Sequence, residues 1–236
     1  MPIRAVLFDL GNTLVSYYRV DEFPAILRQS LDACCEELKP DARRIADPEL
    51  FNLALALNQE ASDHVVRPLA DRLGVLFPEC RADAVAMERL STAFLRPIFA
   101  TAKIDPDAIS VLEALRAHGH SLAIVSNTPW GSSAAHWREE LRRHGLLAAV
   151  DAVVFCVDTG FRKPHPAAIR RALEALDVSA SDAIFVGDDA QWDIAGACAA
   201  GVRPLLLLPS LEFVSRDPVP AVHRLKDVLE YVAVAK

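Results

Sequence analysis

The sequence predicts an α/β fold built on a doubly wound parallel sheet, and two observations indicate it. Short runs of apolar and β-branched residues, each followed by polar or small residues, are typical of strands buried on both faces. The clearest runs span 5–8, 121–125 and 183–186, and weaker ones span 152–157 and 202–208. Helical patterns alternate with these runs, at 106–118, 133–144, 166–176 and 193–200. Ligands of such sheets bind beyond the carboxyl ends of the strands, so the residues that follow each strand are candidates for a site.

Residues 16–99 interrupt this alternation, because they contain helical patterns but no convincing strand. Prolines, among them Pro48, Pro68 and Pro78, separate the helical stretches. The predicted helices span 23–38, 48–57, 65–73 and 82–95. We therefore expect an α/β core formed by 1–15 and 100–236, with an all-helical domain at 16–99 inserted after the first strand.

The chain of 236 residues has an ordinary globular composition, with 52% hydrophobic and 24% charged residues. This composition excludes a disordered or collagen-like chain, and the length is sufficient to bury a core. It contains 25 lysines and arginines and 32 aspartates and glutamates, which gives a net charge of −7. A surface of this charge does not attract nucleic acid or anionic lipid, so we expect neither as a partner. A small anionic substrate would need a local cationic site.

Cysteine usage and the N-terminal residues favour a cytoplasmic protein. The five cysteines are odd in number and form no C-x-x-C pair, so we expect neither a disulfide framework nor a zinc site. The adjacent Cys34 and Cys35 are predicted to fill the core rather than to form a redox pair. The first apolar stretch is too short for a signal segment, and no apolar run reaches the roughly 18 residues of a membrane span. Nothing in the sequence distinguishes a monomer from a homodimer.

Polar residues follow the predicted strands where ligands are expected. Asp9 follows the first strand and Asp188 follows the strand at 183–186, with Asp193 further along the same segment. Carboxylates from two strand ends can hold Mg²⁺, which prefers hard oxygen ligands. A hydroxyl, backbone N–H groups and a lysine can neutralise a phosphoryl group beside the metal. Such groups are present at Ser126, Asn127 and Lys163.

These segments resemble, in order and position, the four motifs of the haloacid dehalogenase superfamily, and the helical insertion resembles its C1 cap. The likeness covers nearly the whole chain and implies a Rossmann-like core. It implies that Asp9 is the nucleophile that forms an aspartyl-phosphate and also binds Mg²⁺. Asp188 would be the second carboxylate ligand, and Asp193 would coordinate through water or orient the ligands.

The resemblance also implies how the phosphate is held. Ser126 and the backbone of Asn127 would bind phosphate oxygens, and Lys163 would screen the repulsion between Asp9 and the incoming dianion. It points to a Mg²⁺-dependent hydrolase, a phosphatase that acts on a small phosphorylated metabolite.

Gly11 departs from the phosphatase pattern of this superfamily. Two residues after the nucleophile, most of its phosphatases carry a second aspartate that acts as the general acid for the leaving group. The backbone carbonyl of Gly11 can still face Mg²⁺, but no side chain can donate a proton there. General acid catalysis contributes roughly 10²–10⁴-fold to such reactions. The sequence thus predicts a slow enzyme, one that uses another acid, or one that acts on esters with good leaving groups.

Two other functions stay open. One is 2-haloacid dehalogenation, in which an aspartate attacks carbon without a metal; members with that activity also lack the second aspartate. The acidic segment from Asp188 to Asp193 argues against it, because a carboxylate cluster repels a carboxylate substrate unless a cation occupies it. The other is a binding module that has lost its catalytic activity, which Gly11 leaves possible.

For some of the remaining polar residues we predict a structural role, and for others two roles are possible. Asp189 is predicted to be a capping or loop residue and His165 a loop residue near the rim. His64 and Arg67 are predicted to lie on a solvated helix face. Substrate contact and hinge packing are both open for Tyr17, Tyr18 and Arg19.

Overall fold

The computed structural model describes residues 2–38, 48–58, 61–208 and 219–234. These residues contain a six-stranded parallel sheet in the order β5-β4-β1-β6-β7-β8. The strands are β1 (Ala5–Phe8), β4 (Ser121–Ser126), β5 (Ala152–Phe155), β6 (Ala183–Gly187), β7 (Arg203–Leu207) and β8 (Ala221–Val222). From the central β1 the chain adds β4 and β5 on one side and then β6, β7 and β8 on the other. This reversal of direction confirms the doubly wound α/β fold.

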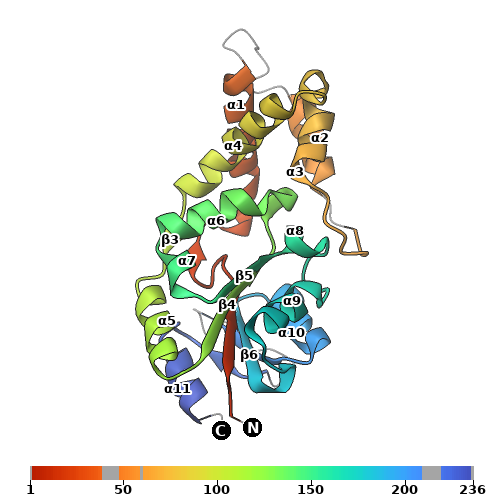
Figure 1. Cartoon of the computed structure of the whole chain (residues 1–236). Helices are drawn as coiled ribbons and strands as arrows, with labels where there is room; N and C mark the ends of the chain where they lie inside the picture. Colours follow the sequence, from red (N-terminus) through yellow and green to blue (C-terminus); the bar gives the residue numbers. More distant parts are fainter. Residues whose placement is uncertain (1, 39–47, 59–60, 209–218, 235–236) are drawn as a thin grey trace.

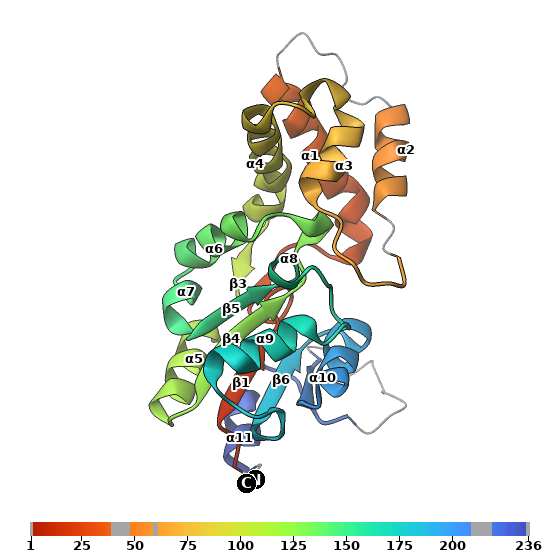
Figure 2. The same cartoon turned by 45° about the vertical axis from the view of Figure 1, so that its right-hand side comes forward.

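Helices cover both faces of the sheet (Figures 1 and 2). One face packs against α5 (Ala108–Ala117), α6 (Ala134–Arg143), α7 (Leu146–Ala149) and α11 (Asp227–Val234). The other face packs against α9 (Ala167–Leu176) and α10 (Ala195–Ala200). Along β1, Val6 and Phe8 join the first layer, whereas Ala5 and Leu7 join the second. Because both faces are covered, both sets of side chains are apolar, and this explains the continuous apolar runs in the sequence.

The described residues between 20 and 100 are mainly helical and lie beyond the carboxyl edge of the sheet (Figures 1 and 2). Their elements are η1 (Val20–Glu22), α1 (Phe23–Leu38), α2 (Pro48–Leu57), α3 (Leu69–Leu76), η2 (Pro78–Cys80) and α4 (Ala84–Ala100). The helices α1 and α4 pack along one another, and the thiol of Cys34 donates a hydrogen bond to the carbonyl of Leu90 at 3.5 Å. Cys34 and Cys35 are both buried, so the prediction that they fill the core is confirmed.

A two-stranded antiparallel ribbon stands where this helical segment joins the sheet. Its strands are β2 (Val15–Ser16) and β3 (Lys103–Ile104). The backbone N–H of Asp105 donates to the carbonyl of Leu14 at 2.9 Å and extends the pairing. The sequence did not predict this ribbon, because strands of two residues show no periodicity.

The segment before α3 differs from the prediction, which placed a helix over 65–73. The helix begins only at Leu69, because Pro68 disfavours helical backbone in the residue before it. Residues 64–66, which precede it, pair with the loop at 160–162. Val65 forms an antiparallel bridge with Phe161, and the N–H of Arg162 donates to the carbonyl of His64 at 2.8 Å. The prediction that His64 and Arg67 lie on a solvated helix face is therefore wrong. The segment that carries them contacts the loop at 160–162 instead.

The strand predicted over 152–157 ends at Phe155, because the next residues turn into α8 (Cys156–Thr159). A carboxylate oxygen of Asp158 accepts a hydrogen bond from the N–H of Phe155 at 2.9 Å and stabilises this turn. Two C-terminal elements, β8 and α11, were not predicted at all. No helix in the described part of the chain combines the length and the apolar character needed to cross a membrane.

Candidate active site

The parallel register brings the predicted site residues to one edge of the sheet. Phe8 is level with Ile124 of β4 and with Val186 of β6. The residues just beyond these positions therefore meet at the carboxyl edge, which is where Asp9 and Asp188 lie. The N–H of Asp9 donates to the carbonyl of Val186 at 2.9 Å, so the strand pairing itself fixes the position of Asp9.

Three carboxylates converge there and form the group that we call the acidic cluster: Asp9, Asp188 and Asp193. One carboxylate oxygen from each lies within 4.8 Å of the others. Asp9 and Asp193 are almost fully buried, and Asp188 is partly exposed. The structure thus brings together the carboxylates that the sequence placed on separate segments.

Lys163 bridges two members of the acidic cluster from a fully buried position. Its Nζ donates to Asp9 Oδ1 at 2.5 Å, to Asp193 Oδ1 at 2.6 Å and to the carbonyl of Val125 at 3.0 Å. Burial alone would lower the pKa of Lys163, but the negative charges of Asp193 and Asp9 outweigh burial and raise it. Lys163 is therefore a permanent cation that holds one oxygen of Asp9.

The acidic cluster carries more negative charge than this lysine offsets. Burial, followed by the negative charges of Asp9 and Asp193, raises the pKa of Asp188 to about 8. Carboxylates kept this close in a buried place are stabilised by a bound cation, and an all-oxygen donor set suits a hard divalent ion. The residues present therefore fit a metal site at Asp9, Asp188 and Asp193.

Gly187 at the end of β6 allows Asp193 to approach this closely. A Cβ added to Gly187 would lie 2.3 Å from Asp193 Oδ2 and 2.5 Å from Asp193 Cβ, which is well inside contact distance. Asp193 lies in the π-helical turn η5 (Ala190–Ile194), which precedes α10. The N–H of Asp189 donates to Asp193 Oδ2 at 3.2 Å. Only glycine at 187 leaves room for this arrangement.

We expect Gly187→Ala to displace Asp193 from Lys163 and to destabilise the protein by about 1–3 kcal/mol through overpacking. Thermal melting and turnover measure the two effects. Gly11→Ala is the matched control for stability, because a Cβ at Gly11 meets no heavy atom within 4 Å. Equal melting temperatures for Gly187→Ala and Gly11→Ala would contradict this prediction.

Asn127 holds the loop that carries Lys163, a role that the sequence did not indicate. The N–H of Lys163 donates to Asn127 Oδ1 at 2.8 Å, and Asn127 Nδ2 donates to the carbonyl of Lys163 at 3.2 Å. The hydroxyl of the buried Ser126 donates to the carbonyl of Asn127 at 3.4 Å. Both residues line the same cavity as Asp9, so the predicted phosphate-binding residues lie beside the predicted nucleophile.

This cavity has a volume of about 200 Å³ and we call it the polar cavity. Gly11 contributes to its wall, as does Arg162, a second cation that sequence reasoning missed. Arg162 Nη1 donates to the carbonyl of Thr128 at 3.1 Å. The sequence offered one indication of Arg162, which is its position directly before Lys163. Neighbouring residues of one loop lie close to the same site.

The remaining predicted residues are placed as follows. Asp189 caps η5 through hydrogen bonds from the N–H groups of Gln191 and Trp192, which confirms its capping role. His165 lies in a loop and stacks on Phe161, with 4.1 Å between ring centroids. Arg19 is exposed and pairs with Asp21. Tyr17 and Tyr18 line a second cavity beside the polar cavity.

The acidic cluster and the buried Lys163 lie at the carboxyl ends of the central strands of a doubly wound sheet. This is an α/β protein with a charged site at the topological switch point. The chain belongs to the haloacid dehalogenase-like hydrolase family, whose sequence model matches residues 3–201. The protein is therefore a hydrolase of this family.

Named relatives and a solved structure agree with this family. The chain is 32% identical over 218 residues to ribulose-1,5-bisphosphate 5-phosphatase of Halopiger xanaduensis, covering 88% of this chain and 86% of that protein. It is 37% identical over 229 residues to phosphoglycolate phosphatase of Rhodospirillum rubrum, covering 94% and 85%. The crystal structure of 2-haloacid dehalogenase from Pseudomonas syringae pv. tomato aligns with a TM-score of 0.72 at 26% identity, covering 99% of this chain and 100% of that one.

Proposed function

We propose that this protein is a Mg²⁺-dependent phosphatase that hydrolyses a small phosphorylated metabolite through an aspartyl-phosphate on Asp9. The observation that carries the proposal is the acidic cluster bridged by Lys163, with Nζ 2.5 Å from Asp9 Oδ1. A bound Mg²⁺ would be held by Asp9 and Asp188, with the carbonyl of Gly11 and, through water, Asp193; it would supply positive charge to phosphate oxygens. Phosphatases among the relatives support the same reaction.

In the first step Asp9 attacks the phosphorus atom. Lys163 holds Oδ1 of Asp9, so Oδ2 is the oxygen that forms the new P–O bond. The ester P–O bond breaks and its electron pair stays on the leaving oxygen, which takes a proton from solvent water because Gly11 supplies none, so that the alcohol departs. In the second step water attacks the phosphorus and gives up a proton to solvent, while the bond between phosphorus and Asp9 breaks; this releases inorganic phosphate and restores the carboxylate. One difficult displacement thus becomes two easier ones.

Lys163, Ser126 and Asn127 serve the phosphoryl group. The ammonium of Lys163 offsets the repulsion between Asp9 and the incoming dianion, and its buried position makes this interaction stronger than in water. Ser126 and the backbone of Asn127 bind phosphate oxygens. The side chain of Asn127 meanwhile keeps the Lys163 loop in place.

We further propose that residues 16–99 form a cap over a core made of 1–15 and 100–236. Two observations support this division. The ribbon β2–β3 lies at the two connections between these parts, and the segment 64–66 pairs with the loop at 160–162, directly before Lys163. Opening and closing at these contacts would admit substrate and exclude water during phosphoryl transfer.

Metal dependence is the test of the proposed function. We expect phosphate release to require Mg²⁺ and to stop with a chelator, and Asp188→Ala to lower turnover by roughly 10²-fold because it removes a direct ligand. Asp182→Ala is the matched control, because Asp182 lies at the opposite end of β6 in η4 (Ala180–Asp182). Metal-independent phosphate release, or equal losses in both variants, would contradict the assignment.

A 2-haloacid dehalogenase is the second candidate function, and the likeness to the Pseudomonas syringae structure favours it. The acidic cluster opposes it, because three carboxylates with ligand atoms within 4.8 Å repel the carboxylate of a 2-haloacid. Halide release from a 2-haloacid without added metal, together with no phosphate release from any ester, would establish this alternative.

A further inference from the structure

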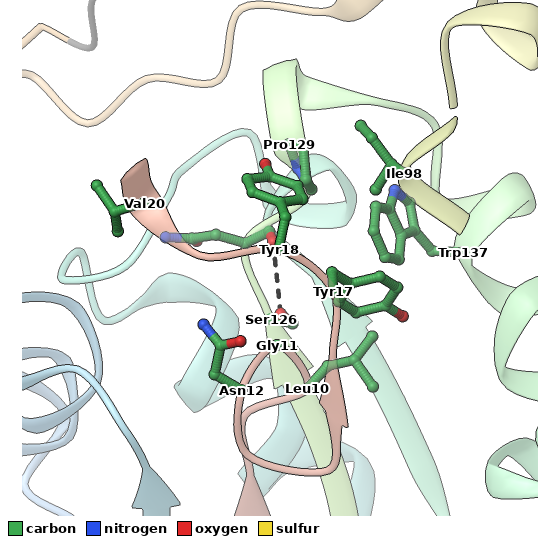
Figure 3. A pocket seen from close by; sticks show the side chains of 11 residues that line it. Leu10, Gly11, Asn12, Tyr17, Tyr18, Val20, Ile98, Ser126, Pro129 and Trp137 are labelled. Atoms are coloured by element: carbon green, nitrogen blue, oxygen red, sulfur yellow. Dashed lines mark hydrogen bonds between the residues drawn. The ribbon is translucent and has the colours of Figure 1, made fainter. Parts of the chain in front are cut away.

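A second cavity, of about 190 Å³, adjoins the polar cavity. Figure 3 shows the side chains that line it. The two cavities share Gly11, Ser126 and Asn127 in their walls. A phosphoryl group bound between Ser126 and Asp9 would therefore have its ester substituent directed to this second cavity. We call it the apolar recess, because of the walls described next.

Aromatic and aliphatic side chains form most of the recess (Figure 3): Tyr17, Tyr18, Ile98, Pro129 and Trp137. Trp137 packs edge-on against Tyr17, with 5.5 Å between ring centroids. Its indole N–H is used within the protein, because Nε1 donates to the Ser132 hydroxyl at 2.8 Å. The wall that Trp137 contributes is therefore held in place and offers carbon surface to a ligand.

No lysine, arginine, histidine, aspartate or glutamate of the described chain lines the recess. Burial, with the negative charges of Glu140 and Asp9, raises the pKa of Tyr17 far above neutral pH, so its phenol stays uncharged. A carboxylate or a second phosphate in the recess would lose hydration and would meet no counter-ion among the residues that line it, which is costly. An uncharged apolar group would lose nothing and would bury its surface.

We propose that the apolar recess binds the alcohol part of the substrate and that this part is an uncharged, apolar group about the size of one ring. The volume agrees with this assignment, since a cavity of roughly 150 Å³ already suffices for benzene. The inference rests on the proposed phosphatase function. It would separate this chain from the two relatives named above, because ribulose bisphosphate and phosphoglycolate carry hydroxyl groups or further anionic groups.

Steady-state kinetics on the intact protein with Mg²⁺ tests the inference, using benzyl phosphate, glycerol 3-phosphate and phosphoglycolate. All three are alkyl esters, so leaving-group ability differs little among them. We expect kcat/KM for benzyl phosphate to exceed the other two by roughly 10- to 100-fold. Equal or better hydrolysis of either polar ester would overturn the inference but not the phosphatase. If p-nitrophenyl phosphate and all three esters resisted hydrolysis, the proposed function itself would be wrong.

A size change in the wall gives a second test that does not depend on how much protein is folded. Ile98→Ala enlarges the recess, so the ratio of kcat/KM for naphthylmethyl phosphate to that for benzyl phosphate should rise roughly 10-fold. Leu95→Ala is the matched control, since Leu95 is equally buried on α4 but does not line the recess. Ile98→Val, which is less disruptive, should shift the ratio less and in the same direction. The same ratio in the Ile98 variants and in Leu95→Ala would overturn the inference.

Discussion

Asp9→Asn is expected to lower turnover by roughly 10³-fold or more while the fold is retained. The amide keeps the size of the carboxylate but loses the charge that attacks phosphorus. The fold should persist, because Asp193 still pairs with Lys163 at 2.6 Å and one of three crowded negative charges is removed. Phosphate release and thermal melting measure the two parts of this prediction.

The native protein should also give a phosphorylated Asp9 after an acid quench, detectable by mass spectrometry, and Asp9→Asn should give none. Asp182→Asn provides the control, because it makes the same chemical change at the opposite end of β6. More than a few per cent of parent activity in Asp9→Asn would refute covalent catalysis. A native protein without measurable turnover would instead support a binding module.

Gly11→Asp is expected to raise the hydrolysis of esters with poor leaving groups by up to roughly 10²–10⁴-fold, the contribution of a general acid. In the native protein no side chain at this position can protonate the departing alcohol. The rate across a series of aryl and benzyl phosphates should therefore depend steeply on the pKa of the leaving group. Gly11→Asp should flatten this dependence.

The structure allows this substitution. A Cβ at Gly11 meets no heavy atom within 4 Å, and Gly11 is not among the residues with positive φ. Gly11→Asn is the matched control, because it has the same shape but no acidic proton. A stable Gly11→Asp protein with an unchanged leaving-group dependence would mean that another group, from the substrate or the helical segment, already donates the proton.

The apolar runs predicted the sheet well because parallel strands buried on both faces leave a local signal. The strand at Ala5–Phe8 was predicted with its bounds, and so was the α1 helix at Phe23–Leu38. The ribbon of Val15–Ser16 with Lys103–Ile104 and the strand at Ala221–Val222 were missed. Each is only two residues long, and its pairing partner defines it, so the sequence nearby carries no period to detect.

The sequence also allowed candidate site residues to be identified, since polar residues that directly follow buried strands are easy to recognise. The arrangement of these residues in space could not be predicted from the sequence. Lys163 lies 154 positions from Asp9, yet the two side chains are hydrogen-bonded. The predicted helix around Val65 is wrong for a local reason, since Pro68 disfavours helical backbone before it, but the pairing of Val65 with Phe161 could not be predicted, because it depends on contacts far apart in the chain.

The sequence by itself determined the α/β class, the helical insertion and the set of candidate residues, because each leaves its mark within a few neighbouring positions. Only the tertiary structure decided that Lys163 joins two of the three carboxylates, that Gly187 makes room for Asp193, and that Tyr17 and Trp137 enclose an apolar recess. These features arise where strand ends, loops and helices meet. The physical reason is that packing in three dimensions sets distances, burial and local charge, and no local pattern encodes them.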